Sequence, residues 1–340
     1  MKKELTTDQR NKRRIIVIIS LFVLLLIIFL IGCSIGKYAL SLDMVFKTFF
    51  GNGNKNSNMV IFEFRLPRLC ITILVGLGMG ASGVILQNLL HNDLASPGTL
   101  GVADGSSLFV TLYFAFIAKN NERPELLPIL AFAGGIISTL IIYLLSTKKR
   151  KQISPIKLIM TGVAMGACYG AISTFLMFIL DETQLSSLQR WSAGDISNTI
   201  PWANVLVLFI WIIVLLTIAM FLTRIIDVIN LGYDIATGLG VNIKIMFFVL
   251  VFVAVAMSSA SVAFGGNFFF LGLIGPHIAR KLVGTKTKFL IPAAGVVSAI
   301  IILVANILVE NVTIFANIPT GIFVSIIAVP YFIYLLIKAR

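Results

Sequence analysis

The sequence predicts an all-α integral membrane protein with about ten transmembrane helices. Of its 340 residues, 58% are hydrophobic and only 12% are charged, and the mean hydropathy is +1.01. Soluble domains carry about 45–50% apolar and about 25% charged residues. Ten spans of roughly 20 residues would use about 200 positions. This composition excludes a soluble enzyme, a disordered protein and a nucleic-acid-binding module, and it leaves no room for a second soluble domain.

The first element is an uncleaved membrane helix. A basic run from Lys2 to Arg14 precedes an apolar run from Ile15 to Gly32. A signal peptide would have a shorter apolar core and a cleavage site of small residues. We therefore expect residues 1–14 to form a cytoplasmic basic tail, and residues 15–340 to form a single polytopic transmembrane domain.

Nine further apolar runs follow along the chain. They cover residues 67–90, 97–118, 128–147, 156–180, 202–223, 245–264, 268–283, 289–309 and 319–337. The run at 268–283 is the weakest, because it is short and contains Arg280 and Lys281. If it spans the membrane, the chain has ten helices and both ends lie on one side. A re-entrant segment is the alternative for this run.

The distribution of positive charge favours ten helices with both ends inside. That arrangement places 19 of the 27 Lys and Arg residues on the cytoplasmic side, which is the side that they prefer. The cytoplasmic side then carries a net charge of +14 and the outer side is neutral. The formal charge of +13 therefore records orientation and does not indicate a nucleic-acid partner or an anionic substrate.

Few residues suited to chemistry lie in the predicted spans. Asp104 is the one ionisable residue well inside a span, where it could serve as a proton or substrate site. We favour a simpler role, in which it lies near an irregular helix start and is hydrogen-bonded to its neighbours. The chain has no G-x-x-x-x-G-K-[ST] phosphate loop and no catalytic pair, and its histidines and cysteines lack metal-ligand spacing. We expect no ATPase site, no enzyme activity and no metal site.

Small residues are frequent instead. Gly162, Gly166 and Gly170 form a stripe at helical spacing, which allows close approach of a neighbouring helix. Packing is the favoured role, and the alternative is a face that rocks between two conformations. Three residues that flank the stripe face either lipid or a pathway and are candidates for pathway lining, namely Met160, Met165 and Tyr169.

A cytoplasmic stretch from Arg224 to Asn242 separates the sixth and seventh spans. Within it, two Leu-Gly pairs end at Gly232 and Gly240 and bracket a short helical piece. Glycine after a short helix is typical of a C-cap. Two short helices joined at glycines could form a docking knob for a partner protein. A simple interfacial connector is an equally good interpretation of the composition alone.

Several motifs resemble FecCD-type permeases, the membrane subunits of ABC importers for iron–siderophore, haem and vitamin B12. They lie, in order, at RLPR (65–68), GLGMGASGVILQNLLHNDLASPGTLGVADG (76–105), LGYDIATGLGV (231–241), FFFLGLIGPHIARKLVG (268–284) and IPTGIFVSIIAVPYFIYLL (318–336). The resemblance extends from about residue 65 to the C-terminus and agrees with the ten-helix count.

The resemblance implies a type II ABC importer permease fold in a bacterial cytoplasmic membrane. It implies a second permease subunit, identical or different, two cytoplasmic ATPase subunits and an extracellular substrate-binding protein. ATP and Mg²⁺ would bind to the ATPase partners, so we expect no cofactor in this chain. A ferric siderophore is the expected cargo. Haem or cobalamin is the alternative within the family, and a stand-alone secondary transporter is the less favoured alternative outside it.

The resemblance also assigns roles to residues. Arg65 and Arg68 would dock acidic residues of the binding protein at the outer mouth. Glu310 stands where the family often has an outer arginine, which is the basis for a hypothetical heterodimer. The ATPase-coupling loop would cover about residues 224–243. Its predicted members are Asp227, Leu231, Gly232, Ala236, Leu239 and Gly240.

Overall fold

A computed structural model describes residues 7–36, 38–118, 123–147, 154–196, 200–315 and 318–338. Each of the ten predicted runs contains a helix. These are α1 (Thr7–Ser34), α4 (Leu66–Leu90), α5 (Val102–Leu112), α6 (Leu126–Ser146), α7 (Pro155–Met177), α9 (Trp202–Phe221), α12 (Ile243–Gly265), α13 (Leu271–Val283), α14 (Thr287–Asn311) and α15 (Thr320–Lys338). Within the described ranges, seven helices are long and apolar enough to cross a membrane, and two shorter apolar helices cover Val102–Ile117 and Thr320–Ile333. The predicted all-α membrane fold is confirmed.

Short helices connect these spans. The segment after α1 forms α2 (Leu42–Phe49) and α3 (Lys55–Asn58), and a π-helical turn at Met59–Arg65 leads into α4. Helix α8 (Glu182–Ser192) follows α7, and α10 (Thr223–Ile229) and α11 (Tyr233–Gly238) follow α9. The sequence predicted α10 and α11 as short helical pieces, but it did not predict α2, α3 or α8.

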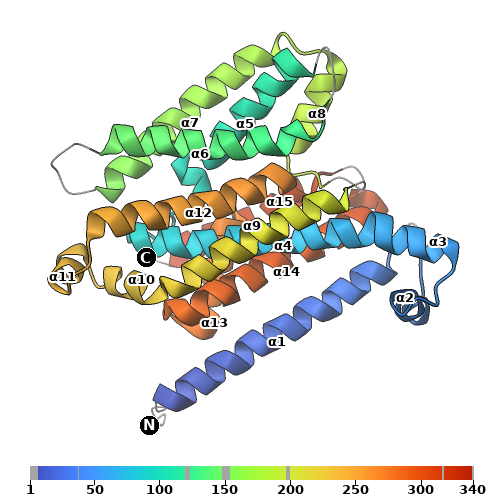
Figure 1. Cartoon of the computed structure of the whole chain (residues 1–340), viewed down its shortest axis with the longest axis horizontal. Coiled ribbons are helices and arrows are strands. Elements are labelled where there is room, and N and C mark those ends of the chain that lie inside the picture. Colours follow the sequence, from blue (N-terminus) through green and yellow to red (C-terminus); the bar gives the residue numbers. More distant parts are fainter. Residues whose placement is uncertain are drawn as a thin grey trace.

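Helix α4 lies at the centre of the bundle, packed against α14, α12, α13 and α9 (Figure 1). Its glycines make this packing close. A Cβ atom on Gly83 would lie 2.1 Å from the carbonyl oxygen of Gly272, and one on Gly76 would lie 2.3 Å from the Cα of Ala299. Helices α5, α6 and α7 form a second group, which contacts the first mainly through α12.

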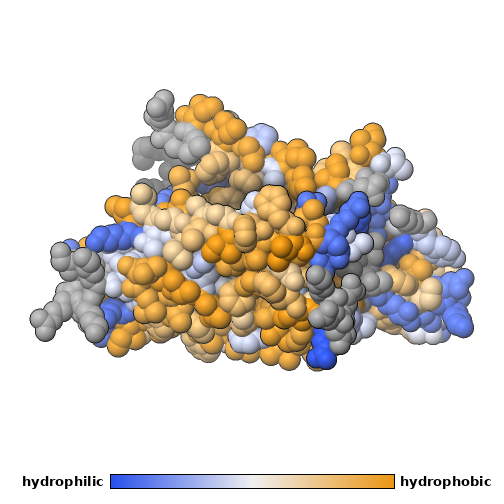
Figure 2. Space-filling view, turned by 90° about the horizontal axis from the view of Figure 1, so that it is seen from above, coloured by the Kyte–Doolittle hydropathy of each residue, from blue (hydrophilic) through white to orange (hydrophobic). Residues whose placement is uncertain are grey.

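The outer helices present their apolar side chains to the surroundings. The most apolar part of α1 is only 11% buried and that of α7 is 22% buried, whereas the corresponding windows of α12 and α14 are 72% buried. Figure 2 shows hydrophobic residues along the middle of the molecule and hydrophilic residues gathered toward its two ends. This pattern is that of a bundle whose peripheral helices face lipid acyl chains.

Helix α13 occupies the weakest predicted span, residues 268–283, and shows whether this segment crosses the bundle. With 13 residues it is about 20 Å long, shorter than the roughly 30 Å hydrocarbon core. Non-helical residues 266–270 complete the passage between the end of α12 and the start of α13. The start of α14 hydrogen-bonds to the end of α4, through Asn88 and Thr287, beside the α10–α11 element that precedes α12. Helices α12 and α14 therefore begin at the same end of the bundle, and the segment between them crosses it.

The first and last helices agree with the prediction that both ends of the chain lie on one side of the membrane. Helix α1 begins and α15 ends at the end of the bundle that carries α10 and α11 (Figure 1). The basic run at 1–14 is helical from Thr7 onward, and its first six residues lie outside the described ranges. The Arg14 Nε donates a hydrogen bond to the Val283 carbonyl oxygen over 2.8 Å, so this end of α1 is tied to the end of α13.

Candidate functional site

The α10–α11 element depends on two glycines with left-handed backbone angles. Gly232, between the two helices, has a φ of 114°, and Gly240, after α11, has a φ of 85°. Each N–H closes a turn, to the carbonyl oxygens of Ile229 and Thr237 respectively, over 2.9 Å. A Cβ atom at either position would meet nothing within 4 Å. The glycines are therefore required by the backbone conformation and not by lack of space.

Helices α10 and α11 are bonded to the end of α4. The Tyr233 hydroxyl donates to the Leu89 carbonyl oxygen over 2.5 Å, and the His91 Nε2 lies 3.0 Å from the Ile229 carbonyl oxygen. The His91 and Tyr233 rings also pack edge to face, with centroids 4.9 Å apart. Burial raises the pKa of Tyr233 to about 12, so the phenol remains a donor at physiological pH.

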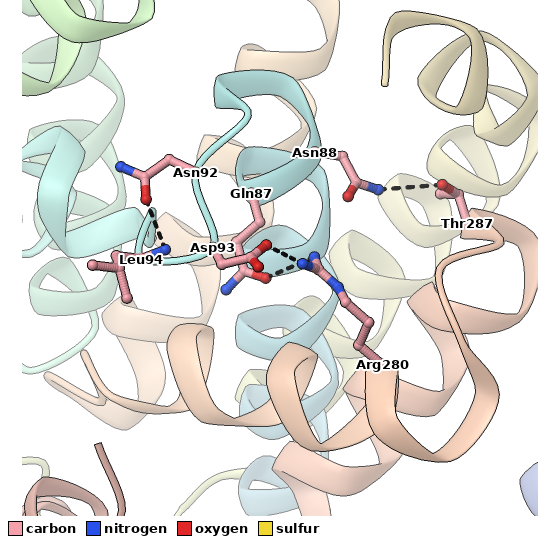
Figure 3. A network of polar contacts seen from close by, with 7 residues as sticks. All are labelled: Gln87, Asn88, Asn92, Asp93, Leu94, Arg280 and Thr287. Carbon is pink, nitrogen blue, oxygen red and sulfur yellow. Dashed lines mark hydrogen bonds and ion pairs between the residues drawn. The ribbon is translucent and has the colours of Figure 1, made fainter. Parts of the chain in front are cut away.

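A second connection runs from α10 to α14. The Asp227 carboxylate accepts a hydrogen bond from the backbone N–H of Thr287, the first residue of α14, over 3.0 Å. Asn88, near the end of α4, donates to the Thr287 hydroxyl over 3.2 Å, as Figure 3 shows. The element is thus attached to both of the central helices, and a displacement of α10 must act on α4 and α14 together.

The same end of α4 is also connected to α13. The guanidinium of Arg280 forms an ion pair with Asp93 and donates to the Gln87 side-chain oxygen over 3.1 Å (Figure 3). Asp93 lies in the turn that follows the end of α4. This ion pair fixes the turn after α4 to α13.

The outward face of α11 is apolar. Ile235 on α11 is 54% exposed, and Leu231 and Leu239, in the turns just before and after this helix, are 61% and 64% exposed. Ala236, predicted as a member of the same site, is fully buried against the bundle. The sequence interpretation omitted Ile235, which the structure shows to be exposed between Leu231 and Leu239. We call Leu231, Ile235 and Leu239 the apolar tip.

At the opposite end of the bundle, the predicted docking residues make contacts within the chain. The Arg68 guanidinium lies 2.6 Å from the Glu310 carboxylate, and the two side chains are 8% and 32% exposed. The Arg65 guanidinium donates to the carbonyl oxygens of Cys33 and Tyr38, over 2.6 and 2.5 Å. Glu310 therefore neutralises Arg68, and Arg65 holds the end of α1 against α4.

The three candidate pathway residues do not share a face of α7. Met160 is 67% exposed, Met165 is half-buried, and Tyr169 is 7% exposed and packs in the core. Nine residues separate the first from the last, which at 100° per residue places them on opposite sides of the helix. A pathway along one face of α7 would include Met160 or Tyr169, but not both.

A cavity of about 370 Å³ lies between the start of α5, the end of α8, the non-helical segment before α13 and the first turns of α15. Asp104 lines it, together with Ser192, Asn267 and Ser325. The predicted irregular helix start is present, since α5 begins at Val102 after a left-handed Gly101. The predicted hydrogen bonds between Asp104 and its neighbours are absent, because no described residue donates to its carboxylate. In the first turn of α5 its carboxylate lies close to Gly166 of α7.

Among the described residues, nine helices in or beside the predicted spans accompany a central α4, and an exposed apolar tip is bonded to that helix, which defines a multi-pass membrane permease. The chain belongs to the FecCD transport family, whose sequence model matches residues 24–338. This assignment places it in the cytoplasmic membrane as a transport protein.

Known relatives cover nearly the whole chain. It is 34% identical over 319 residues to the iron(3+)-hydroxamate import system permease protein FhuG of Bacillus subtilis, covering 92% of this chain and 94% of the relative. It is 36% identical over 331 residues to the Fe(3+)-citrate import system permease protein YfmE of the same organism, covering 97% of both. A solved metal-chelate type ABC transporter in an inward-facing conformation matches with a TM-score of 0.80 and 27% identity, over 96% of this chain and 99% of that chain.

Proposed function

We propose that this chain is the permease subunit of an ABC importer that carries a ferric siderophore across the cytoplasmic membrane. Import-system permeases for Fe³⁺-hydroxamate and Fe³⁺-citrate are among its relatives, and a metal-chelate ABC transporter shares its fold. The observation that carries the proposal is the apolar tip, which is exposed at the end of the bundle and attached to α4 and α14.

The partners follow from the geometry of that tip. Three exposed apolar side chains, on α11 and in the turns at its two ends, form a surface suited to a groove in a cytoplasmic ATPase subunit. Two such ATPase subunits would bind ATP and Mg²⁺ and power transport. A second permease subunit would complete the pathway, and an extracellular binding protein would deliver the chelate. No cofactor is needed in this chain. A stand-alone secondary transporter would have no use for the tip.

The proposed cycle transmits force through hydrogen bonds already described. Movement of the ATPase subunits displaces α10 and α11, whose contacts with Leu89 and Thr287 pull on α4 and α14. Because α4 is the most central helix, its displacement changes the packing of α13 and α12 as well. The bundle would in this way alternate between outward-open and inward-open states.

The test of function is uptake of labelled ferric siderophores, haem and cobalamin in a strain that lacks the gene. Restoration of ferric siderophore uptake by the gene together with its ATPase and binding-protein partners supports the proposal. Restoration of haem or cobalamin uptake alone would show that the chain carries a different substrate of the same family. Uptake by this chain in vesicles that lack any ATPase contradicts the proposal.

The test of the tip is a triple substitution, Leu231→Ser, Ile235→Ser and Leu239→Ser. Burial of each apolar side chain against a partner contributes about 1.5–3 kcal/mol, so association with the ATPase should weaken by at least about tenfold. Co-purification from nanodiscs and the stimulated ATPase rate measure the effect. Thr237→Ala, an exposed polar position on the same helix, is the control and should change neither quantity. Undiminished association of the triple variant would assign ATPase docking to another surface.

A further inference from the structure

The cavity beside α5 contains a carboxylate at the depth of the membrane centre. A Cβ atom on Gly166 would lie 2.6 Å from an Asp104 carboxylate oxygen, so Asp104 is level with that glycine. Gly166 is the central residue of α7, which extends from Pro155 to Met177 and is long enough to span the bilayer. Asp104 therefore lies about midway through the bundle, on the cavity wall.

No cation balances this carboxylate within the part of the chain that the structure describes. None of the described side chains forms an ion pair or a hydrogen bond with it, and it is the one ionisable group among the described residues that line the cavity. An ionisable residue at this depth is costly, and those that occur typically face a water-filled cavity that carries a substrate or an ion. Structure formation alone does not account for Asp104.

The rest of the wall also suits a cation. The rings of Phe269 and Phe270, both half-buried, line the cavity, with centroids 4.9 Å apart in an edge-to-face pair. Aromatic faces attract ammonium groups through the ring quadrupole. The side chains of Ser192, Asn267 and Ser325 offer hydrogen-bond acceptors in the same space. No positively charged side chain among the described residues lines this wall, so an anion has nothing to pair with.

We propose that this cavity receives a positively charged arm of the transported chelate, with Asp104 as the counter-charge that selects for it. The inference rests on the proposed function and specifies its cargo. The cavity, at about 370 Å³, has the size of a small-ligand pocket and accommodates one arm of a chelate. A ferric tris-hydroxamate is uncharged at its iron centre, so an ammonium arm makes the whole chelate a cation. Ferric catecholate and ferric citrate complexes are anionic, and Asp104 repels them.

The experiment compares two ligands that differ only in the charge of this arm. The first is a linear ferric tris-hydroxamate with a terminal ammonium group, and the second is the same chelate with that amine acetylated. Initial uptake rates of both, labelled with iron, are measured in cells that contain the whole importer, at concentrations that saturate the binding protein. The wild type should favour the ammonium form by about tenfold, the factor that one charge-assisted hydrogen bond supplies.

Two pairs of variants test the carboxylate. Asp104→Asn should abolish the preference for the ammonium form, whereas Asp104→Glu should retain it. Gly166→Ala places a methyl group against the Asp104 oxygen without removing the charge, and should reduce the preference several-fold. Gly170→Ala, on the same stripe but with nothing within 4 Å of the added methyl, is its matched control and should behave as the wild type. Immunoblots of membranes normalise each rate to the amount of protein.

Each outcome decides between the inference and the function. Equal rates for both ligands in the wild type, or an unchanged preference in Asp104→Asn, would overturn the role of Asp104 and leave the importer assignment intact. Uptake of anionic chelates with rejection of both hydroxamates would do the same. In Asp104→Asn, uptake of the two hydroxamates could fall equally while less of the complex assembles. That result would show that the carboxylate pairs with a partner subunit. Failure of the wild-type importer to carry any iron chelate would overturn the proposed function itself.

Discussion

Arg68 and Glu310 show how a single pair of residues changes the interpretation of an outer surface. Both charges lie at the end of the bundle opposite α10 and α11, where a binding protein is expected to dock. The guanidinium is 8% exposed and its partner is 32% exposed, so their contact over 2.6 Å is largely shielded from water. A buried ion pair contributes little over two apolar residues, but loss of one member leaves an unpaired buried charge. The pair therefore holds α4 against α14, and any role in docking is additional to that.

Charge reversal separates these two roles. Arg68→Glu alone and Glu310→Arg alone should each destabilise the protein by about 3 kcal/mol, at the low end for buried pairs because Glu310 is partly exposed. The double exchange should restore most of the loss. Thermal unfolding of the purified permease in detergent measures both. Single variants as stable as the wild type would show that the pair has no structural role. A stable double variant that binds the binding protein less tightly would support docking at this surface.

Sequence reasoning reached some of these residues and not others, for identifiable reasons. It predicted Leu231 and Leu239 from the coupling motif but missed Ile235, whose exposure depends on how α11 packs on the bundle. Spacing along a helix was sufficient to separate Met160 from Tyr169. The pairing of Arg68 with Glu310 was not predictable, because 242 positions separate them and only the packing of α4 on α14 brings them together. The environment of Asp104 depends in the same way on α7, α15 and the non-helical segment before α13.

At the scale of elements, the α10–α11 pair has its shape imposed by glycine backbone angles. Neither Gly232 nor Gly240 is crowded, so a larger side chain there acts through backbone strain alone. A non-glycine residue in a left-handed conformation costs about 1–2 kcal/mol. That cost is small against the stability of the bundle but large against the bonds that hold α11 to α4. Strain at these positions therefore changes the orientation of α11 before it affects insertion.

Gly240→Val should reduce ATPase stimulation and transport while leaving the amount of protein in the membrane unchanged. The matched control is Gly238→Val, because Gly238 also has nothing within 4 Å of an added Cβ atom and its φ is not positive. Transport rates and ATPase rates of the reconstituted complex, normalised to protein in the membrane, measure the difference. Equal activity of the two valine variants would show that the backbone angle at residue 240 is unimportant for coupling.

Hydropathy predicted the long elements well because a lipid-facing helix must be apolar over its whole length. Helix α13 was the weakest prediction, and the structure explains why: its 13 residues cross only part of the bundle. Helix α8 was missed because its sequence is mostly polar, so no apolar run marks it. Its capping box at Asp181 and Gln184 was a local signal for a helix start that hydropathy does not detect.

For the whole molecule, the arrangement requires the apolar tip and the α2–α3 segment to lie on opposite sides of the membrane. Cysteines introduced by Ile235→Cys and Asn52→Cys test this, after Cys70 and Cys168, which are not fully buried, are replaced by serine. A membrane-impermeant maleimide should label position 52 in intact cells and position 235 only after permeabilisation. Labelling of position 235 in intact cells would show that the orientation is opposite to the one inferred here.

The connection of α11 to α4 also has a thermodynamic consequence. Coupling between two binding sites is reciprocal, since each ligand changes the affinity for the other by the same factor. Helix α4 contacts Tyr233 through its Leu89 carbonyl oxygen and lies against Gly272 of α13 at Gly83, close to the phenylalanines of the cavity. If ATPase docking at the tip changes, through α4, the affinity of the cavity for cargo, occupation of the cavity must change the affinity for the ATPase by the same factor. The two ends of the permease are then linked equilibria, and the nucleotide-binding partner senses whether cargo is present.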